Sequence, residues 1–118
     1  MPEGRDASHV AYFSMEMALD SAMPTYSGGL GVLAGDTMRA AADAGLRMVG
    51  VTILYNEGYF TQVLDVQGKQ LERPVTWEPE DFLELMDAKV TIGIEGRDVA
   101  IRAWRYKITG VQGHKIDV

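Results

Sequence analysis

The chain has 118 residues, of which 47% are hydrophobic and 24% charged, and these values predict one globular domain and exclude a disordered or low-complexity segment. Its 17 acidic and 11 basic residues give a net charge of −6, which argues against nucleic acid and anionic membranes as partners because both require a basic surface. The sequence contains no cysteine, so disulfides, thiolate metal sites and cysteine nucleophiles are excluded.

The two ends of the sequence predict where the protein resides and how it continues. The opening stretch, MPEGRDASH, lacks the apolar run of a signal peptide, and no later segment approaches the ~20 apolar residues that span a bilayer. We therefore expect a soluble, cytoplasmic protein. Residues 111–118 still alternate apolar and polar side chains without a closing turn. This pattern is typical of a segment of a longer chain.

Two apolar strands are expected in the first half. Residues 10–13 form a short apolar run, and residues 48–55 form a nearly continuous one of the kind that is buried on both faces of a parallel sheet. Between them, the methionine-rich piece 15–23 predicts one or two helical turns that end at Pro24. We interpret its methionines, Met15, Met17 and Met23, as adaptable core residues.

One helix is predicted more clearly than any other element. Apolar residues recur at helical spacing from Leu30 onward and predict a helix over 30–44. Ser27 is the expected N-cap, and Gly45 is the expected left-handed residue at the end. Polar side chains on the other face are expected to be solvated or to face another subunit: Asp36, Arg39 and Asp43.

The second half is expected to be rich in strands. Residues 59–64 and 70–75 are predicted to pair around a turn at 65–69, and three further strands are predicted at 89–94, 99–107 and 114–118. We therefore expect an α/β fold within 1–118, with a strand–loop–helix–strand unit at 9–55 and a hairpin extension at 56–118.

The glycine-rich stretch SGGLGVLAGD, residues 27–36, lies just before and within the predicted helix. Its glycines either allow close packing or leave room for an anion at the free N–H groups of the helix start. A P-loop is excluded because Asp36 stands where Lys should follow the last glycine. The spacing of Gly29, Gly31 and Ala34 fits a dinucleotide fingerprint, although Pro24 to Ser27 precede it in place of a strand. That alternative stays open.

Three ordered segments carry a closer resemblance: YFSME at 12–16, PTYSGGLGVLAGD at 24–36 and LYNEGYFTQ at 54–62. Their order and spacing resemble the amino-terminal region of the α-glucan (glycogen and maltodextrin) phosphorylases, especially the short bacterial and archaeal forms. The resemblance covers most of the chain from Val10 onward. It implies the first, Rossmann-like lobe of a GT-B glycosyltransferase.

The resemblance also implies an activity and its partners. Such enzymes split α-1,4-glucans with inorganic phosphate to release glucose 1-phosphate, and they use pyridoxal phosphate through its phosphate group. The implied partners are therefore the glucan, phosphate and the remainder of the phosphorylase chain, and a homo-oligomer is left open. By motif match, the main-chain N–H groups of Gly28, Gly29 and Leu30 would hold phosphate, while Ser27 and Gly31 shape the turn.

Glu16 matches a family acid that lies close to the catalytic cleft, which makes it a candidate catalytic residue. The alternative is a carboxylate that caps a turn or forms a salt bridge. Tyr55, Glu57 and Tyr59 would line the entrance of the cleft or simply pack against the hairpin. The two histidines have no suitably spaced partner, so no metal site or catalytic triad is expected at His9 and His114.

The chain departs from the family in its lysines. The family binds pyridoxal phosphate on a lysine in a glycine-rich segment near its carboxyl end, and no such context surrounds Lys69, Lys89, Lys107 or Lys115. We therefore expect the isolated chain to be inactive. The alternatives to a phosphorylase segment are a stand-alone phosphate- or dinucleotide-binding module and a non-catalytic assembly domain.

Overall fold

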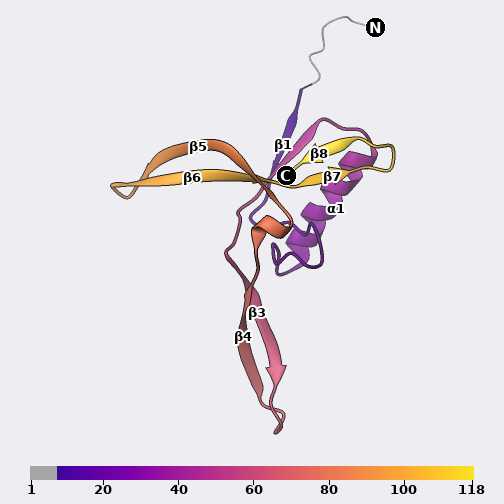
Figure 1. Ribbon diagram of the computed structural model, residues 1–118. Coiled ribbons are helices and arrows are strands. Elements are labelled where there is room, and N and C mark those ends of the chain that lie inside the picture. Colours follow the sequence, from indigo (N-terminus) through magenta and orange to yellow (C-terminus); the bar gives the residue numbers. More distant parts are fainter. Residues whose placement is uncertain (1–7) are drawn as a thin grey trace, which may run out of the picture.

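The computed structural model describes residues 8–118 (Figure 1). Most of the opening stretch on which the signal-peptide argument rests, residues 1–7, lies outside the described residues. The described part is a small α/β domain with one α-helix and mostly strands. In chain order its elements are β1 (Val10–Phe13), α1 (Gly29–Asp43), β2 (Met48–Val51), β3 (Glu57–Leu64), β4 (Gln70–Thr76), a 3₁₀ helix η1 (Pro79–Asp81), β5 (Glu84–Ile94), β6 (Arg97–Arg105), β7 (Lys107–Thr109) and β8 (Lys115–Asp117).

The strand–helix–strand unit of the first half forms as predicted in its order and direction. β1 and β2 are parallel, with Val10 opposite Met48 and Phe13 opposite Val51. The second strand is shorter than predicted because its partner β1 is only four residues long, so the ladder ends at Val51. The prediction that this strand is buried on both faces is also wrong, because Gly50 is buried but the side chains of Val51 and Ile53 are exposed.

The predicted helix is confirmed with a shift of one residue. Its buried residues recur at spacings of three and four and form one face: Gly31, Ala34, Gly35, Met38, Ala41 and Ala42. The helix ends in a Schellman motif, because Gly45 has a positive φ of 69° and the N–H of Leu46 donates to the carbonyl oxygen of Ala41 at 3.0 Å. The predicted cap at the other end is wrong: Gly28 occupies the N-cap position, and no side chain caps the helix.

The methionine-rich piece 15–23 is not helical, contrary to prediction. Asp20 accepts a hydrogen bond from the N–H of Ala22 at 2.8 Å, which forms a local turn in place of a helical one. The irregular path turns Met17 and Met23 inward, and both are fully buried in the core beside α1. Their predicted role as core residues is confirmed, whereas Met15 is exposed.

Three antiparallel hairpins make up the second half, and the one predicted as a pair, β3–β4, is confirmed. The single strand predicted at 99–107 is wrong, because these residues are divided between β6 and β7, which belong to different hairpins. β3 pairs with β4 and β5 with β6, and Figure 1 shows these two ribbons projecting from the body in different directions. The predicted turn at 65–69 is closed by the Asp65 carboxylate, which accepts the N–H groups of Gln67 and Lys69 at 2.9 and 2.8 Å. β5 is longer than predicted and begins at Glu84, with an irregular register before Lys89.

The last hairpin, β7–β8, returns to the first unit and packs against α1 and β2. Its turn is bound to the end of the helix, because the N–H of Val111 donates to the Asp43 carboxylate at 2.9 Å and the His114 imidazole nitrogen lies 2.8 Å from the carbonyl oxygen of Leu46. Ile108 and Ile116 complete the core. Within residues 8–118, no helix has the length and apolar character needed to cross a bilayer.

Candidate functional site

The glycine loop is joined to the segment that follows β1 by a short ladder of hydrogen bonds. The N–H of Met17 donates to the carbonyl oxygen of Thr25 at 3.0 Å, and the buried Thr25 hydroxyl donates back to the carbonyl oxygen of Met17 at 2.6 Å. The N–H of Ala18 donates to the carbonyl oxygen of Gly31 at 2.9 Å. The start of α1 is therefore held against residues 16–18.

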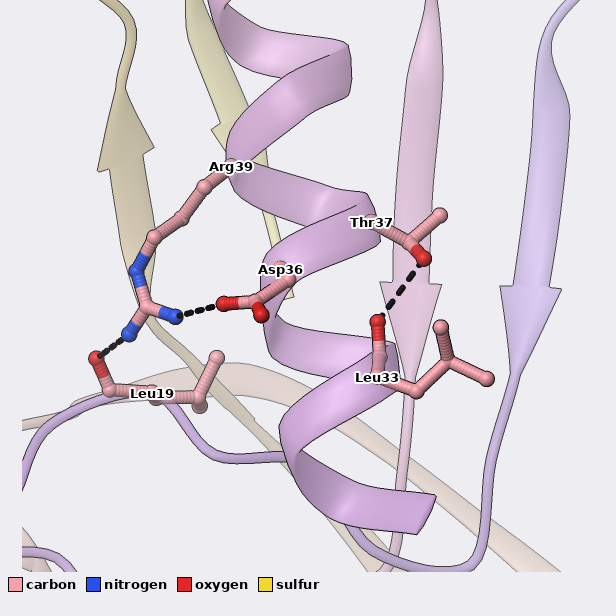
Figure 2. A network of polar contacts seen from close by, with 5 residues as sticks. All are labelled: Leu19, Leu33, Asp36, Thr37 and Arg39. Carbon is pink, nitrogen blue, oxygen red and sulfur yellow. Dashed lines mark hydrogen bonds and ion pairs between the residues drawn. The ribbon is translucent and has the colours of Figure 1, made fainter. Parts of the chain in front are cut away.

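Arg39 secures the next part of the same segment (Figure 2). Its Nη2 donates to the carbonyl oxygen of Leu19 at 2.6 Å, and its Nη1 pairs with Asp36 one helical turn away at 3.5 Å. The polar flank predicted on this helix face is thus partly engaged within the chain. Sequence reasoning missed this contact because the acceptor is a main-chain oxygen twenty residues away.

Glu16 extends the ladder to the residue just before the helix cap. Its Oε2 accepts the main-chain N–H of Ser27 at 2.6 Å and the Ser27 hydroxyl at 3.1 Å. The N–H of Ser27 is the main cause that lowers the pKa of Glu16, and partial burial opposes it; the Ser27 hydroxyl and the N–H groups of Gly31 and Gly28 add to the lowering. The carboxylate is therefore charged at neutral pH and lies at the positive end of α1.

The glycines of the loop fall into two structurally distinct groups. Gly31 and Gly35 are buried, and an added Cβ would overlap the Cβ of Tyr26 at the first and the carbonyl oxygen of Ala18 at the second. Close packing explains both. Gly28 and Gly29 are exposed, and a Cβ at either position would meet no heavy atom within 4 Å. Neither packing nor a left-handed backbone requires glycine there.

The first N–H groups of α1 point out of the helix without an intrahelical acceptor. In the part of the chain that the structure describes, the N–H groups of Gly29 and Leu30 have no recorded acceptor, whereas Gly31 and Val32 bond back to the carbonyl oxygen of Gly28. At the neighbouring positions Gly28 and Gly29, the space where a Cβ would stand is open. The arrangement has the donors, the dipole direction and the room that anion binding requires.

A cavity of about 320 Å³ adjoins Glu16 and Ser27. The three residues predicted at the cleft entrance, Tyr55, Glu57 and Tyr59, all line this cavity. The Tyr55 hydroxyl donates to the carbonyl oxygen of Met15 at 2.9 Å. Tyr59 is 63% exposed, and its ring lies 4.4 Å from that of Phe60. The complete lining is Met15, Glu16, Pro24, Tyr26, Ser27, Tyr55, Glu57, Gly58 and Tyr59. Sequence reasoning did not single out Pro24, Tyr26 or Gly58 for this wall.

The two histidines have different surroundings. His9 is exposed, and His114 belongs to the turn bound to the helix end. Among residues 8–118, no group of three or more His, Asp or Glu side chains is placed to hold a metal ion.

Comparison with known proteins gives no matching family model. The chain is 36% identical over 115 aligned residues to the maltodextrin phosphorylase of Thermococcus litoralis, an alignment that covers 92% of this chain and 14% of the relative. It is 42% identical over 71 residues to the glycogen phosphorylase of Mycobacterium tuberculosis, covering 60% of this chain and 8% of the relative. The resemblance to α-glucan phosphorylases is confirmed.

A third phosphorylase gives the same result. The glycogen phosphorylase of Aquifex aeolicus is 33% identical over 88 residues, which cover 75% of this chain and 12% of the relative. The chain thus spans about one seventh or less of the length of these three phosphorylases. The similarity to each phosphorylase is confined to a segment.

Proposed function

We propose that the chain is the amino-terminal part of an α-1,4-glucan phosphorylase, a glycosyltransferase that splits glucans with inorganic phosphate and releases glucose 1-phosphate. The similarity to maltodextrin and glycogen phosphorylases supports this proposal, and so does the small share of each relative that the chain spans. The parallel β1–β2 pair with α1 as its crossover supports the further proposal that the segment opens a GT-B lobe.

The contribution of this chain is a phosphate-binding loop built from main-chain N–H groups of Gly28, Gly29 and Leu30. The observation that carries this proposal is the contrast between the glycines, since packing accounts for Gly31 and Gly35 but not for Gly28 and Gly29. A phosphate at the start of α1 would meet outward-pointing N–H groups at the positive end of the helix dipole. Ser27 and Gly31 shape the turn that presents these groups.

The cofactor implied by the family is pyridoxal phosphate. The lysines of this chain do not fit its attachment, because no lysine lines the cavity beside the glycine loop. The cationic groups that surround phosphate in such a reaction are missing from the cavity wall as well, because no arginine lines it. We propose that the isolated chain has no phosphorolytic activity.

The test is phosphate-dependent release of glucose 1-phosphate from maltodextrin. The complete protein that carries this segment should release it in proportion to phosphate, and the purified 118-residue chain should release none. Release that does not depend on phosphate, or no release by the complete protein, would refute the proposed function.

A further inference from the structure

Glu16 is fixed at both its main chain and its carboxylate, although it lies in an irregular segment. The Ser14 hydroxyl donates to the main-chain oxygen of Glu16 at 2.7 Å. Its Oε2 takes both donors of Ser27, eleven residues further along the chain. Bonds to an ionised acceptor are about twice as strong as neutral ones, so this contact is the strongest polar link between the segment after β1 and the start of α1.

Gly31 provides the space for this link. A Cβ at Gly31 would lie 3.3 Å from the Cγ of Glu16 and would overlap the Cβ of Tyr26. The aliphatic part of the Glu16 side chain therefore passes over the glycine to reach Ser27. Because Gly31 has no side chain, the Glu16 side chain has room to extend as far as Ser27.

The contact divides the N–H groups of the loop into two sets. The Glu16 carboxylate accepts the N–H of Ser27 and is also stabilised by the N–H of Gly28, whereas the N–H groups of Gly29 and Leu30 donate no hydrogen bond within residues 8–118. Of the three N–H groups proposed above for phosphate, that of Gly28 therefore also interacts with Glu16. Glu57 is the other carboxylate on the same cavity wall, so the cavity side of the loop carries negative charge from both residues. These carboxylates repel an anion that enters the cavity.

We propose that Glu16 is a positioning residue: by bonding both donors of Ser27, it fixes the loop and restricts an incoming anion to the N–H groups of Gly29 and Leu30. The effect on phosphate rests on the function proposed above, whereas the effect on loop order does not. Glu16 thereby acts through Ser27 and makes no contact with the phosphate.

Hydrogen exchange and phosphate kinetics in the complete protein test the proposal with three variants. Glu16→Ala removes the acceptor, Glu16→Gln keeps one acceptor oxygen at the same reach, and Glu72→Ala is the control, because Glu72 lies exposed on β4. Without substrate, the rate of main-chain hydrogen exchange in a peptide spanning residues 25–33 should rise about tenfold in Glu16→Ala. In Glu16→Gln, this rate should be close to that of the parent protein. Glu72→Ala should leave that peptide unchanged.

The kinetic result separates this proposal from the proposed function. In Glu16→Ala, the KM for phosphate should rise several-fold with a smaller change in kcat, because the unfixed loop no longer holds the N–H groups of Gly29 and Leu30 in one arrangement, and this loss outweighs the removal of one negative charge. Unchanged exchange in Glu16→Ala, or no rescue by Glu16→Gln, would overturn the positioning role whatever the kinetics. Faster exchange with an unchanged KM for phosphate would instead refute phosphate binding by the loop, and with it the restriction on the anion.

Discussion

Alanine at Gly31 should destabilise the protein, whereas alanine at Gly29 should not. At Gly31 the new Cβ would overlap the Cβ of Tyr26, which is attached directly to the main chain and cannot move by changing rotamer. Overpacking of this kind costs ~1–3 kcal/mol, and the higher helix propensity of alanine offsets up to about 1 kcal/mol of it. The net expectation for Gly31→Ala is a loss of about 1–2 kcal/mol.

At Gly29 the same substitution meets no heavy atom within 4 Å, and the residue is already helical. Gly29→Ala should therefore leave the free energy of unfolding unchanged or raise it by up to about 1 kcal/mol. Urea unfolding of the 118-residue chain at pH 7, followed by far-UV circular dichroism, measures both variants against the parent. Equal stabilities for the two variants would show that Tyr26 does not pack against the start of α1, and the explanation of the glycines would fail.

Three further changes test the scaffold around the site. Gly45→Ala should lower the free energy of unfolding by ~1 kcal/mol because φ is 69° there while the space is open, so a neutral result in urea would contradict the Schellman end. Thr25→Val should cost about 1–2 kcal/mol, since it removes a buried hydrogen bond to Met17, and Thr25→Ser should cost less. The pKa of Glu84 is lowered first by its hydrogen bond with Arg105 and then by the positive charge of Arg105. The ion pair therefore stabilises the fold at pH values above the ordinary carboxyl pKa, and this stabilisation disappears as the pH falls through the lowered pKa of Glu84. Glu84→Gln should therefore flatten the acid limb of a plot of stability against pH; an unchanged limb would contradict the ion pair.

Local signals account for the elements that were predicted correctly. The helix follows from the apolar spacing after Leu30, and its end follows from a glycine placed where a left-handed residue is needed. The β3–β4 turn follows from Asp65, whose carboxylate bonds main-chain N–H groups within four residues. Each of these features depends on residues that are close together in the sequence.

The errors share a different cause. The helix expected over 15–23 does not form because Met17 and Thr25, eight residues apart, exchange two hydrogen bonds. Ser27 is a favourable cap by residue type, but its hydroxyl donates to Glu16, and the cap position passes to Gly28. These contacts join residues eight or more positions apart, so no local pattern indicates them.

The candidate site was predictable in part. The glycines could be recognised from their motif, but their division into packing and open positions depends on Tyr26 and Ala18, which only the fold places beside Gly31 and Gly35. Glu16 could be singled out by resemblance. Its bond to Ser27 could not, because the intervening segment has no regular structure from which its path could be deduced.

The central claim is that the N–H groups at the start of α1 bind the phosphate used in glucan phosphorolysis. Gly29→Asp in the complete protein is the most direct test, because it places a carboxylate in the open space while an acid in the first turn of a helix does not disfavour folding. Turnover of phosphate and maltodextrin to glucose 1-phosphate should fall by about 10², with a smaller loss in Gly29→Ala and with the melting temperature retained in both. If folded Gly29→Asp keeps parental turnover and an unchanged KM for phosphate, the loop does not bind phosphate.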